Sequence, residues 1–228
     1  MAKEYTYDDV QTAYNEASLT QKNYLNNLEK KNPDRLKLAY NYFKWTSLKT
    51  TLINNENDFK IPYSALPNKI SKPTYDWLLP DKKLIFDKYY KYNSETNSYV
   101  ICAKKSDITY TDIDMIMHSV VLTRKAVVWV EFGVNVGAEF GGRHPAIILK
   151  NLDDSVIVIP LSSQEPNDDK FSVRVNCVYN FPTLIRWANV TRIQEIDISR
   201  IDFSQTIGSV NSTVMKDIAN KIHSCGIL

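Results

Sequence analysis

Glycine is concentrated in one short stretch of this chain, between two runs of β-forming residues. Four of the six glycines, at positions 133, 137, 141 and 142, follow the apolar run 126–132 and precede the apolar run 145–150. Glycine adopts backbone angles that other residues avoid, and it lets a ligand approach the main chain closely. The stretch therefore predicts two strands joined by a loop, which is either a long hairpin connection or a binding element.

The second half of the chain has the pattern of several short strands followed by one helix. Turn-forming Gly, Asn, Asp and Pro residues separate the apolar segments, and Asp153-Asp154 predicts a tight hairpin. Val214, Ile218 and Ile222 recur at helical spacing. The predicted strands are 126–132, 145–150, 155–161, 171–178 and 183–190, and the predicted helix is 212–223. Short antiparallel strands with a terminal helix indicate a small barrel or rolled sheet.

The N-terminal residues predict a pair of antiparallel helices. Apolar residues recur every three or four positions in 8–31 and again in 34–53, and Asn32-Pro33 stops the first helix and starts the second. Residues 59–81 contain several prolines and no periodicity, so they are predicted to form an extended connector. The expected domains are a helical hairpin (1–58), a connector with a mixed segment (59–125) and a barrel domain (126–228).

The mixed segment allows more than one interpretation. Residues 84–93 alternate Tyr and Lys, a pattern that could stack single-stranded nucleic acid, but a half-buried strand or helix with solvated lysines is the favoured interpretation. Residues 99–103 predict a short strand. Residues 107–122 predict a short helix or an irregular approach to the main sheet.

Composition excludes several classes of protein. A hydrophobic content of 43%, a charged content of 24% and a net charge of +2 describe an ordinary soluble globular chain, not an obvious nucleic-acid binder. Cys102, Cys177 and Cys225 show no zinc-binding spacing and are too few for a disulfide framework, so no metal is expected. No run approaches the roughly 18 apolar residues of a membrane-spanning helix, and a cytoplasmic location is the default expectation.

Three motifs occur in order along the second half. The first runs from Gly137 through Glu139, Gly141-Gly142 and Arg143-His144-Pro145 into an apolar strand. The second follows the next strand, at Pro160-Leu161-Ser162-Ser163-Gln164, and the third is the segment 191–201, which contains Arg192, Gln194 and Arg200. Residues 126–223 thereby resemble the MazF/PemK family of toxin endoribonucleases.

This resemblance implies a fold, an activity and partners. The implied fold class is α+β: an SH3-like barrel with a C-terminal helix, preceded here by the helical hairpin and the extended connector. The implied activity is metal-independent and cofactor-independent cleavage of single-stranded RNA, including mRNA, by a homodimer. Family members are restrained by an antitoxin protein, and the added N-terminal region here could bind a partner, drive dimerisation or provide self-restraint.

The candidate site residues follow from the chemistry of RNA cleavage. His144 is suited to proton transfer because an unperturbed imidazole titrates near neutral pH. Arg143 offers a permanently charged fork for phosphate, and Ser162 can donate a hydrogen bond to a phosphate oxygen. These three are the predicted catalytic residues. The predicted substrate-binding residues are Glu139, Ser163, Gln164 and Arg192.

Departures from the family pattern keep other functions open. His144 stands where the family has arginine, Ser162 stands for threonine, and Arg192 and Gln194 look exchanged. Because strand side chains alternate, Arg143 and His144 should also face opposite ways. The main alternative is a non-catalytic barrel that binds nucleic acid or a protein partner, and a third possibility is a toxin that poisons a protein such as a topoisomerase.

Overall fold

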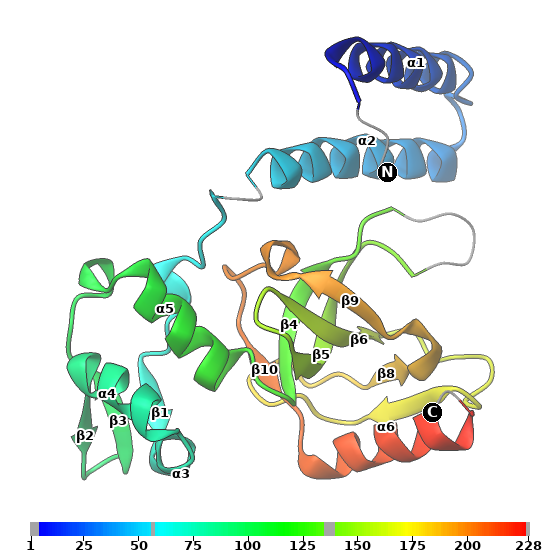
Figure 1. The fold of residues 1–228 in the computed structure, drawn as a ribbon. Coiled ribbons are helices and arrows are strands. Elements are labelled where there is room, and N and C mark those ends of the chain that lie inside the picture. Colours follow the sequence, from blue (N-terminus) through cyan, green and yellow to red (C-terminus); the bar gives the residue numbers. More distant parts are fainter. Residues whose placement is uncertain (1–4, 56–57, 135–139, 227–228) are drawn as a thin grey trace. The chain divides into compact units, whose positions relative to one another are not determined.

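The computed structural model describes residues 5–55, 58–134 and 140–226 (Figure 1). The chain forms two compact units, Met1–Thr51 and Leu52–Leu228. None of the helices in the described ranges combines the length and apolarity needed to cross a bilayer. The α+β fold class expected from the sequence is confirmed.

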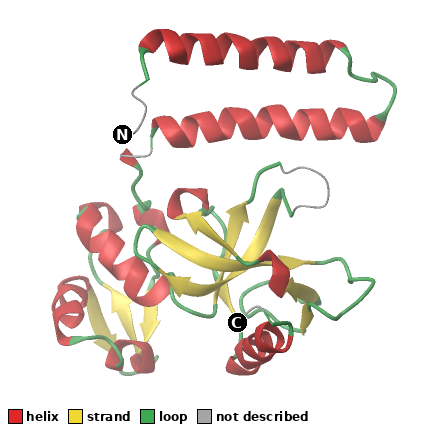
Figure 2. Ribbon diagram, turned by 45° about the vertical axis from the view of Figure 1, so that its right-hand side comes forward, coloured by secondary structure: helices red, strands yellow, loops and turns green. Residues whose placement is uncertain are grey.

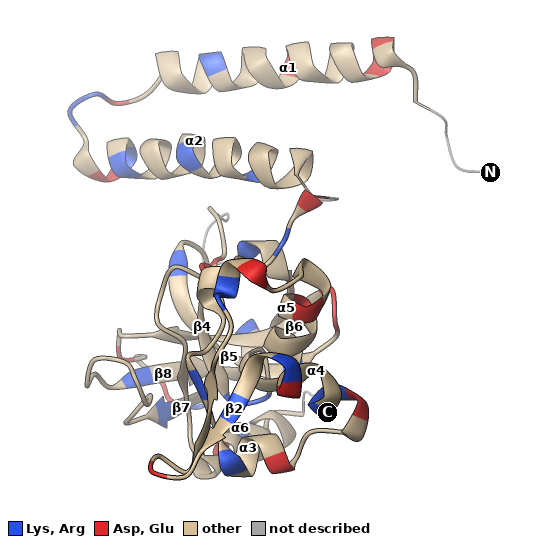
Figure 3. Cartoon of the chain, turned by 90° about the vertical axis from the view of Figure 1, so that its left-hand side faces the viewer, with Lys and Arg blue, Asp and Glu red and all other residues tan. Residues whose placement is uncertain are grey.

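The first unit contains the predicted pair of helices, α1 (Tyr7–Asn26) and all but the last turn of α2 (Pro33–Asn54). Asn32 caps α2, because its side-chain oxygen accepts hydrogen bonds from the N–H groups of Asp34 and Arg35, each at 3.2 Å. Tyr24 of α1 packs against Tyr42 and Phe43 of α2, with ring centroids 5.8 and 6.1 Å apart. Acidic residues lie in the first turn of α1, and basic residues are spread along α2 (Figure 3).

Residues 59–122 are folded, which corrects the prediction that residues 59–81 form an extended connector. Their elements are the 3₁₀ turns η2 (Tyr63–Ala65) and η3 (Lys105–Asp107), the strands β1 (Lys69–Ser71), β2 (Tyr90–Asn93) and β3 (Ser98–Ile101), the helices α3 (Lys72–Asp76), α4 (Pro80–Tyr89) and α5 (Tyr110–Ile116), and the π-helical turn η4 (Met117–Val121). Pro73 and Pro80 lie in the first turns of α3 and α4, where proline suits a helix. These two prolines therefore start short helices. The strands form an antiparallel sheet in the order β1-β3-β2.

The C-terminal part is a curled antiparallel sheet with a terminal helix (Figure 2). Its strands are β4 (Ala126–Glu131), β5 (Arg143–Asn151), β6 (Ser155–Ser162), β7 (Ser172–Val175), β8 (Arg186–Asn189), β9 (Gln194–Asp197) and β10 (Gly208–Ser209), and its helix is α6 (Ser212–Ser224). The strand order is β10-β4-β5-β6-β8-β7, with β9 also paired to β6. The predicted strands and the Asp153-Asp154 hairpin are confirmed. Two strands, β9 and β10, were not predicted.

Both faces of this sheet are buried. Val128 and Ile148 face a core shared with residues 61–122, whereas Val127 and Ile147 face a second core completed by α6. The alternation follows the period of two along a strand. Burial on both faces explains why these segments are continuous apolar runs in the sequence.

A substitution at Gly208 is expected to disturb the edge of this sheet. A Cβ atom there would lie 2.6 Å from both Cδ1 of Phe181 and the carbonyl oxygen of Tyr179. We expect Gly208→Ala to lower the free energy of unfolding by about 1–3 kcal/mol through overpacking, measured by urea denaturation. Ser209→Ala is the control, with an expected change below about 0.5 kcal/mol. Equal stabilities of the two variants would contradict the predicted clash.

Candidate functional site

The start of β5 sends two neighbouring charged or titratable side chains in different directions. His144 pairs in register with Val130 of β4, and Arg143 pairs with Glu131. Arg143 forms an ion pair with Asp202, and its Cζ lies 5.3 Å from the ring centroid of Trp129. The imidazole of His144 instead lies against Phe140, with ring centroids 4.4 Å apart. Adjacent side chains of a strand are expected to point to opposite faces in this way.

The surroundings of His144 favour its neutral form. Partial burial lowers the pKa of the imidazole below its usual value of 6.5, and the positive charge of Arg192 lowers it further. Hydrogen bonds with the backbone of Leu161 and Gly141, and the negative charge of Glu131, act in the opposite direction and raise the pKa. Burial is the largest of these effects, and the net shift is downward. The ring is therefore able to accept a proton at neutral pH.

A small pocket of about 220 Å³ lies beside this histidine, at the end of β6. Its wall is made by the residues Phe140, Pro160, Ser162, Gln164, Glu165, Pro166, Asn167, Ser172, Trp187, Asn189 and Arg192. Phe140 joins the two parts of the site, because it contacts the His144 ring and also lies under the Arg192 guanidinium, whose Cζ is 4.9 Å from the ring centroid. We call this pocket, together with His144, the candidate site.

The Ser162 hydroxyl is already engaged in a turn. It accepts a hydrogen bond from the Gln164 N–H at 3.0 Å and donates one to the Gln164 carbonyl oxygen at 3.3 Å. The turn ends β6 and brings Gln164 to the pocket wall. A hydrogen bond from Ser162 to a ligand would therefore replace the longer of these two contacts.

The structure brings some of the predicted site residues together and leaves others apart. Ser162, Gln164 and Arg192 line the pocket, and His144 reaches it through Phe140. Arg143 is bound to Asp202 and, like the exposed Ser163, is not part of the pocket wall. Glu139 lies outside the described residues.

Sequence reasoning did not predict most residues of the pocket wall, among them Phe140, Trp187 and Asn189. Phe140 could have been recognised from the sequence, because it is an aromatic residue inside a glycine-rich loop. Trp187 and Asn189 reach the pocket because β8 pairs with the end of β6, where Ser162 lies opposite Trp187. That pairing is between segments distant in sequence and leaves no local signal.

Within the described ranges, no group of three or more His, Cys, Asp or Glu side chains is arranged to hold a metal ion. Cys102, Cys177 and Cys225 are all free thiols. The groups at the candidate site that are equipped for chemistry include an imidazole, a guanidinium, the carboxylate of Glu165, hydroxyls and amides.

Comparison with known protein families assigns the second half of the chain to one family. Residues 123–225 match the family described as PemK-like, MazF-like toxin of type II toxin-antitoxin system. This part of the chain is a PemK/MazF-family domain. It contains β4 to β10, α6 and the whole candidate site, whereas the helical hairpin and residues 59–122 lie outside it. The resemblance noted in the sequence is confirmed.

Several solved structures are similar to this domain. The toxin MazF-mt6 of Mycobacterium tuberculosis is 15% identical, with 46% of this chain and 98% of that chain covered and a TM-score of 0.35. MazF from Deinococcus radiodurans is 18% identical (46% and 96% covered, TM-score 0.37), and the MazE-MazF structure from the same organism is 19% identical (45% and 93% covered, TM-score 0.35). No curated protein matches the chain significantly.

The contribution of Arg192 to the site can be tested directly. We expect Arg192→Gln to raise the pKa of His144, because removing a nearby positive charge makes the imidazolium less unfavourable. An NMR titration of the imidazole measures the change. Arg174→Gln, which removes an exposed cation of β7, is the control and should leave the His144 pKa unchanged. A pKa that falls, or stays constant, in Arg192→Gln would contradict this electrostatic coupling.

Proposed function

We propose that this chain is a toxin of a toxin-antitoxin system that cleaves single-stranded RNA without a metal ion. One observation carries the proposal: a half-buried imidazole with a lowered pKa lies beside a pocket that contains a guanidinium, within a PemK/MazF-family domain. A neutral imidazole is a base of suitable strength for removing the proton of a ribose 2′-hydroxyl.

The proposed reaction uses the RNA's own 2′-oxygen as the nucleophile. His144 accepts the 2′-hydroxyl proton, the 2′-oxygen attacks the adjacent phosphorus, and the bond from phosphorus to the 5′-oxygen breaks. The departing 5′-oxygen takes a proton from solvent, and the products are a 2′,3′-cyclic phosphate and a 5′-hydroxyl. Arg192 stabilises the negative charge that builds up on the phosphate oxygens.

Other residues of the pocket are suited to holding the substrate. Phe140 and Trp187 provide aromatic faces on which bases can stack. Gln164 and Asn189 provide amides for hydrogen bonds to base edges or the sugar. Arg143 and Ser162 retain their predicted catalytic roles as proposals, although each must first leave or share its present partner.

The test is a cleavage assay with end-labelled single-stranded RNA in the presence of EDTA. We expect fragments that end in a 2′,3′-cyclic phosphate, with no loss of rate on chelation. Cleavage that stops in EDTA, or fragments with a 3′-hydroxyl, would contradict the proposed chemistry.

A second candidate function is a non-catalytic barrel that binds RNA through the same pocket. The hydrogen bonds that engage the Ser162 hydroxyl in its turn favour this alternative. A gel shift with intact RNA would support it. Growth arrest without RNA breakdown would instead indicate a toxin directed against a protein.

The partners are proposed on the same family relationship. We expect a homodimer in solution, measured by light scattering, and an antitoxin encoded in the adjacent reading frame. Self-restraint by the N-terminal unit is the alternative to a separate antitoxin. Removing residues 1–51 should raise RNA cleavage if that unit restrains the domain, and should leave it unchanged if it does not.

A further inference from the structure

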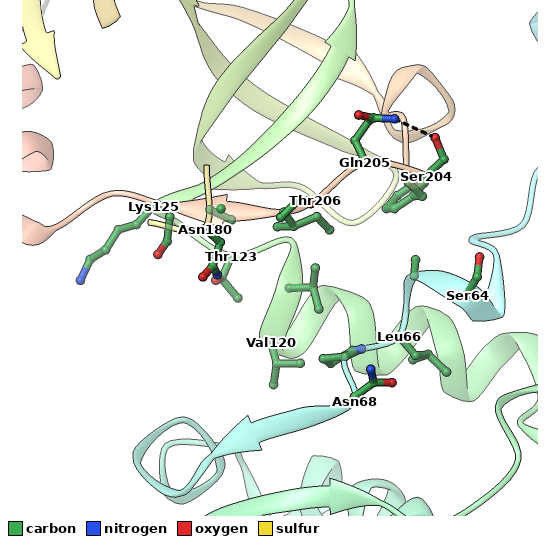
Figure 4. Close-up of a pocket in the computed structure, with 18 of the residues that line it drawn as sticks. Ser64, Leu66, Asn68, Val120, Thr123, Lys125, Asn180, Ser204, Gln205 and Thr206 are labelled. Atoms are coloured by element: carbon green, nitrogen blue, oxygen red, sulfur yellow. Dashed lines mark hydrogen bonds between the residues drawn. The ribbon is translucent and has the colours of Figure 1, made fainter. Parts of the chain in front are cut away.

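A larger cleft lies within the second unit, on elements that the candidate site does not use. Its volume is about 980 Å³, and one wall comes from the folded segment that precedes the family domain while the other comes from the domain itself (Figure 4). Ser64, Leu66, Asn68 and Val120 lie on the first wall, and Asn180, Gln205 and Thr206 lie on the second (Figure 4). Since no residue lines both this cleft and the pocket of the candidate site, the two are separate.

The charged residues of the cleft are all basic. Lys105, Arg124 and Lys125 line it, and no Asp or Glu is part of its described lining. Lys105 donates a hydrogen bond from Nζ to the carbonyl oxygen of Leu66 at 2.5 Å, and Lys125 donates one from Nζ to Ser212 Oγ at 3.0 Å. The described residues offer none of the three a carboxylate within ion-pair distance. Among the described residues, therefore, no ion pair neutralises these three charges.

Lys125 also occupies an unfavourable backbone conformation. Its φ is 84°, a region that glycine or asparagine adopts more readily than lysine. Hydrogen bonds hold it there: its N–H donates to the Ile148 carbonyl at 3.0 Å, and its own carbonyl accepts from the Val210 N–H at 3.0 Å. Lys125 lies at the edge of the cleft, with its ammonium bonded to Ser212 and directed away from Val120 and Leu66 (Figure 4). Backbone strain of this kind is often found at binding sites. Lys125 also allows an informative substitution, because glycine at this position would remove the charge and relieve the backbone strain together.

The rest of the lining suits a ligand that is both anionic and partly apolar. Leu66, Val120 and Phe203 contribute apolar surface, and hydroxyl and amide groups such as those of Thr123 and Asn68 can donate hydrogen bonds. The volume exceeds that needed for a single phosphate ion and is at the upper end of ligand sites. Cations without an ion-pair partner could bind the phosphates of a nucleotide strand, and the polar and apolar surface beside them could contact its sugars and bases.

We propose that this cation-lined cleft binds the phosphodiester backbone of single-stranded RNA at nucleotides outside the cleaved bond. The proposal rests on the proposed function, because it concerns the substrate of the same protein. One wall of the cleft lies outside residues 123–225, so this contact would be specific to chains that carry the preceding segment. Its role would be to hold RNA, and the chemistry would remain at His144.

Binding of an uncleavable RNA tests the cleft independently of catalysis. The probe is a fluorescently labelled 2′-O-methyl RNA oligonucleotide, which lacks the nucleophilic hydroxyl, and its anisotropy is measured on the full chain between about 50 and 200 mM salt. We expect Arg124→Gln and Lys125→Gly each to weaken binding several-fold. Each should also reduce the slope of log affinity against log salt by about 0.7, the value for one contact to a single-stranded phosphate.

Controls separate a specific contact from a change in net charge or folding. Lys216→Gln removes an exposed cation on α6, outside the cleft, and should leave both affinity and slope unchanged. Lys125→Arg keeps the charge and should restore binding, and thermal melting should show that Lys125→Gly is at least as stable as the parent chain. Unchanged affinity in both Arg124→Gln and Lys125→Gly would overturn the proposal. Binding of AMP through these residues, without binding of the oligonucleotide, would also overturn it.

The two proposals can fail separately. If the chain does not cleave RNA but the cleft variants still weaken binding of the uncleavable probe, the proposed function is wrong and the cleft assignment stands. If RNA is cleaved and the cleft variants bind the probe normally, the cleft assignment is wrong and the function stands.

Discussion

Replacing His144 with glutamine is expected to reduce the rate of RNA cleavage by about 10²–10⁴-fold, the usual contribution of a general base. Glutamine keeps polar atoms near the backbone of Leu161 and Gly141 but cannot accept a proton at any accessible pH. The loss should therefore appear in the single-turnover rate at saturating RNA. Affinity for an uncleavable RNA should change little.

The pH profile provides a second and independent signature of the same residue. Burial lowers the pKa of His144 below 6.5, so the imidazole stays neutral as the pH falls through that value and becomes protonated only at more acidic pH. A protonated ring cannot act as a base. We expect the acidic limb of kcat/KM to have its midpoint below 6.5 and to be absent in His144→Gln.

The other two histidines supply controls. His223 is exposed on α6, and His223→Gln should leave the rate and the pH profile unchanged. His118 is hydrogen-bonded to Asn151, so its replacement should affect stability more than cleavage. Full activity in His144→Gln would remove the imidazole from the mechanism. An acidic midpoint above 6.5 would mean that its pKa is not lowered.

Much of the barrel could be predicted because its strands are encoded locally. Residues 145–150 and 155–161 are apolar runs with a turn signal between them, and the structure joins them through Asp153, whose φ of 72° suits an Asp or Asn turn. The short strands β9 and β10 were missed because their pairing, not their composition, makes them strands. The prolines of residues 59–81 led to the wrong prediction of an extended connector, because a proline in a first turn can also start a helix.

The sequence allowed the types of residue in the candidate site to be predicted, but not how their side chains are arranged. The neighbours Arg143 and His144 could be expected to point apart from the alternation of a strand alone. Which of them would lie near Ser162 depended on strand register and on the course of the chain around Phe140. The contact of Arg143 with Asp202 joins residues far apart in the sequence, and no local pattern indicates it.

The largest expected loss of stability is at Phe86, in the segment that precedes the family domain. Its side chain is 0% exposed and belongs to the core that also contains Val128, Val130 and Ile148 of the barrel. Replacing it with alanine removes most of a buried aromatic ring and leaves a cavity. We expect Phe86→Ala to lower the free energy of unfolding by about 3–5 kcal/mol, a large share of the roughly 5–15 kcal/mol of a typical domain.

The shared core makes this a test of how the second unit folds. Because residues of the preceding segment cover one face of the barrel sheet, the segment and the barrel should unfold in one transition. Urea denaturation followed by circular dichroism and by tryptophan fluorescence should give coincident curves, both shifted by Phe86→Ala. Leu84→Ala is the matched control, since Leu84 lies on the same helix but is 71% exposed, and its effect should stay within about 0.5 kcal/mol. If Phe86→Ala separated the curves into two transitions and left the barrel transition in place, the segment would be an independent module. The cleft between the segment and the barrel would then lack the rigid walls that a binding site requires.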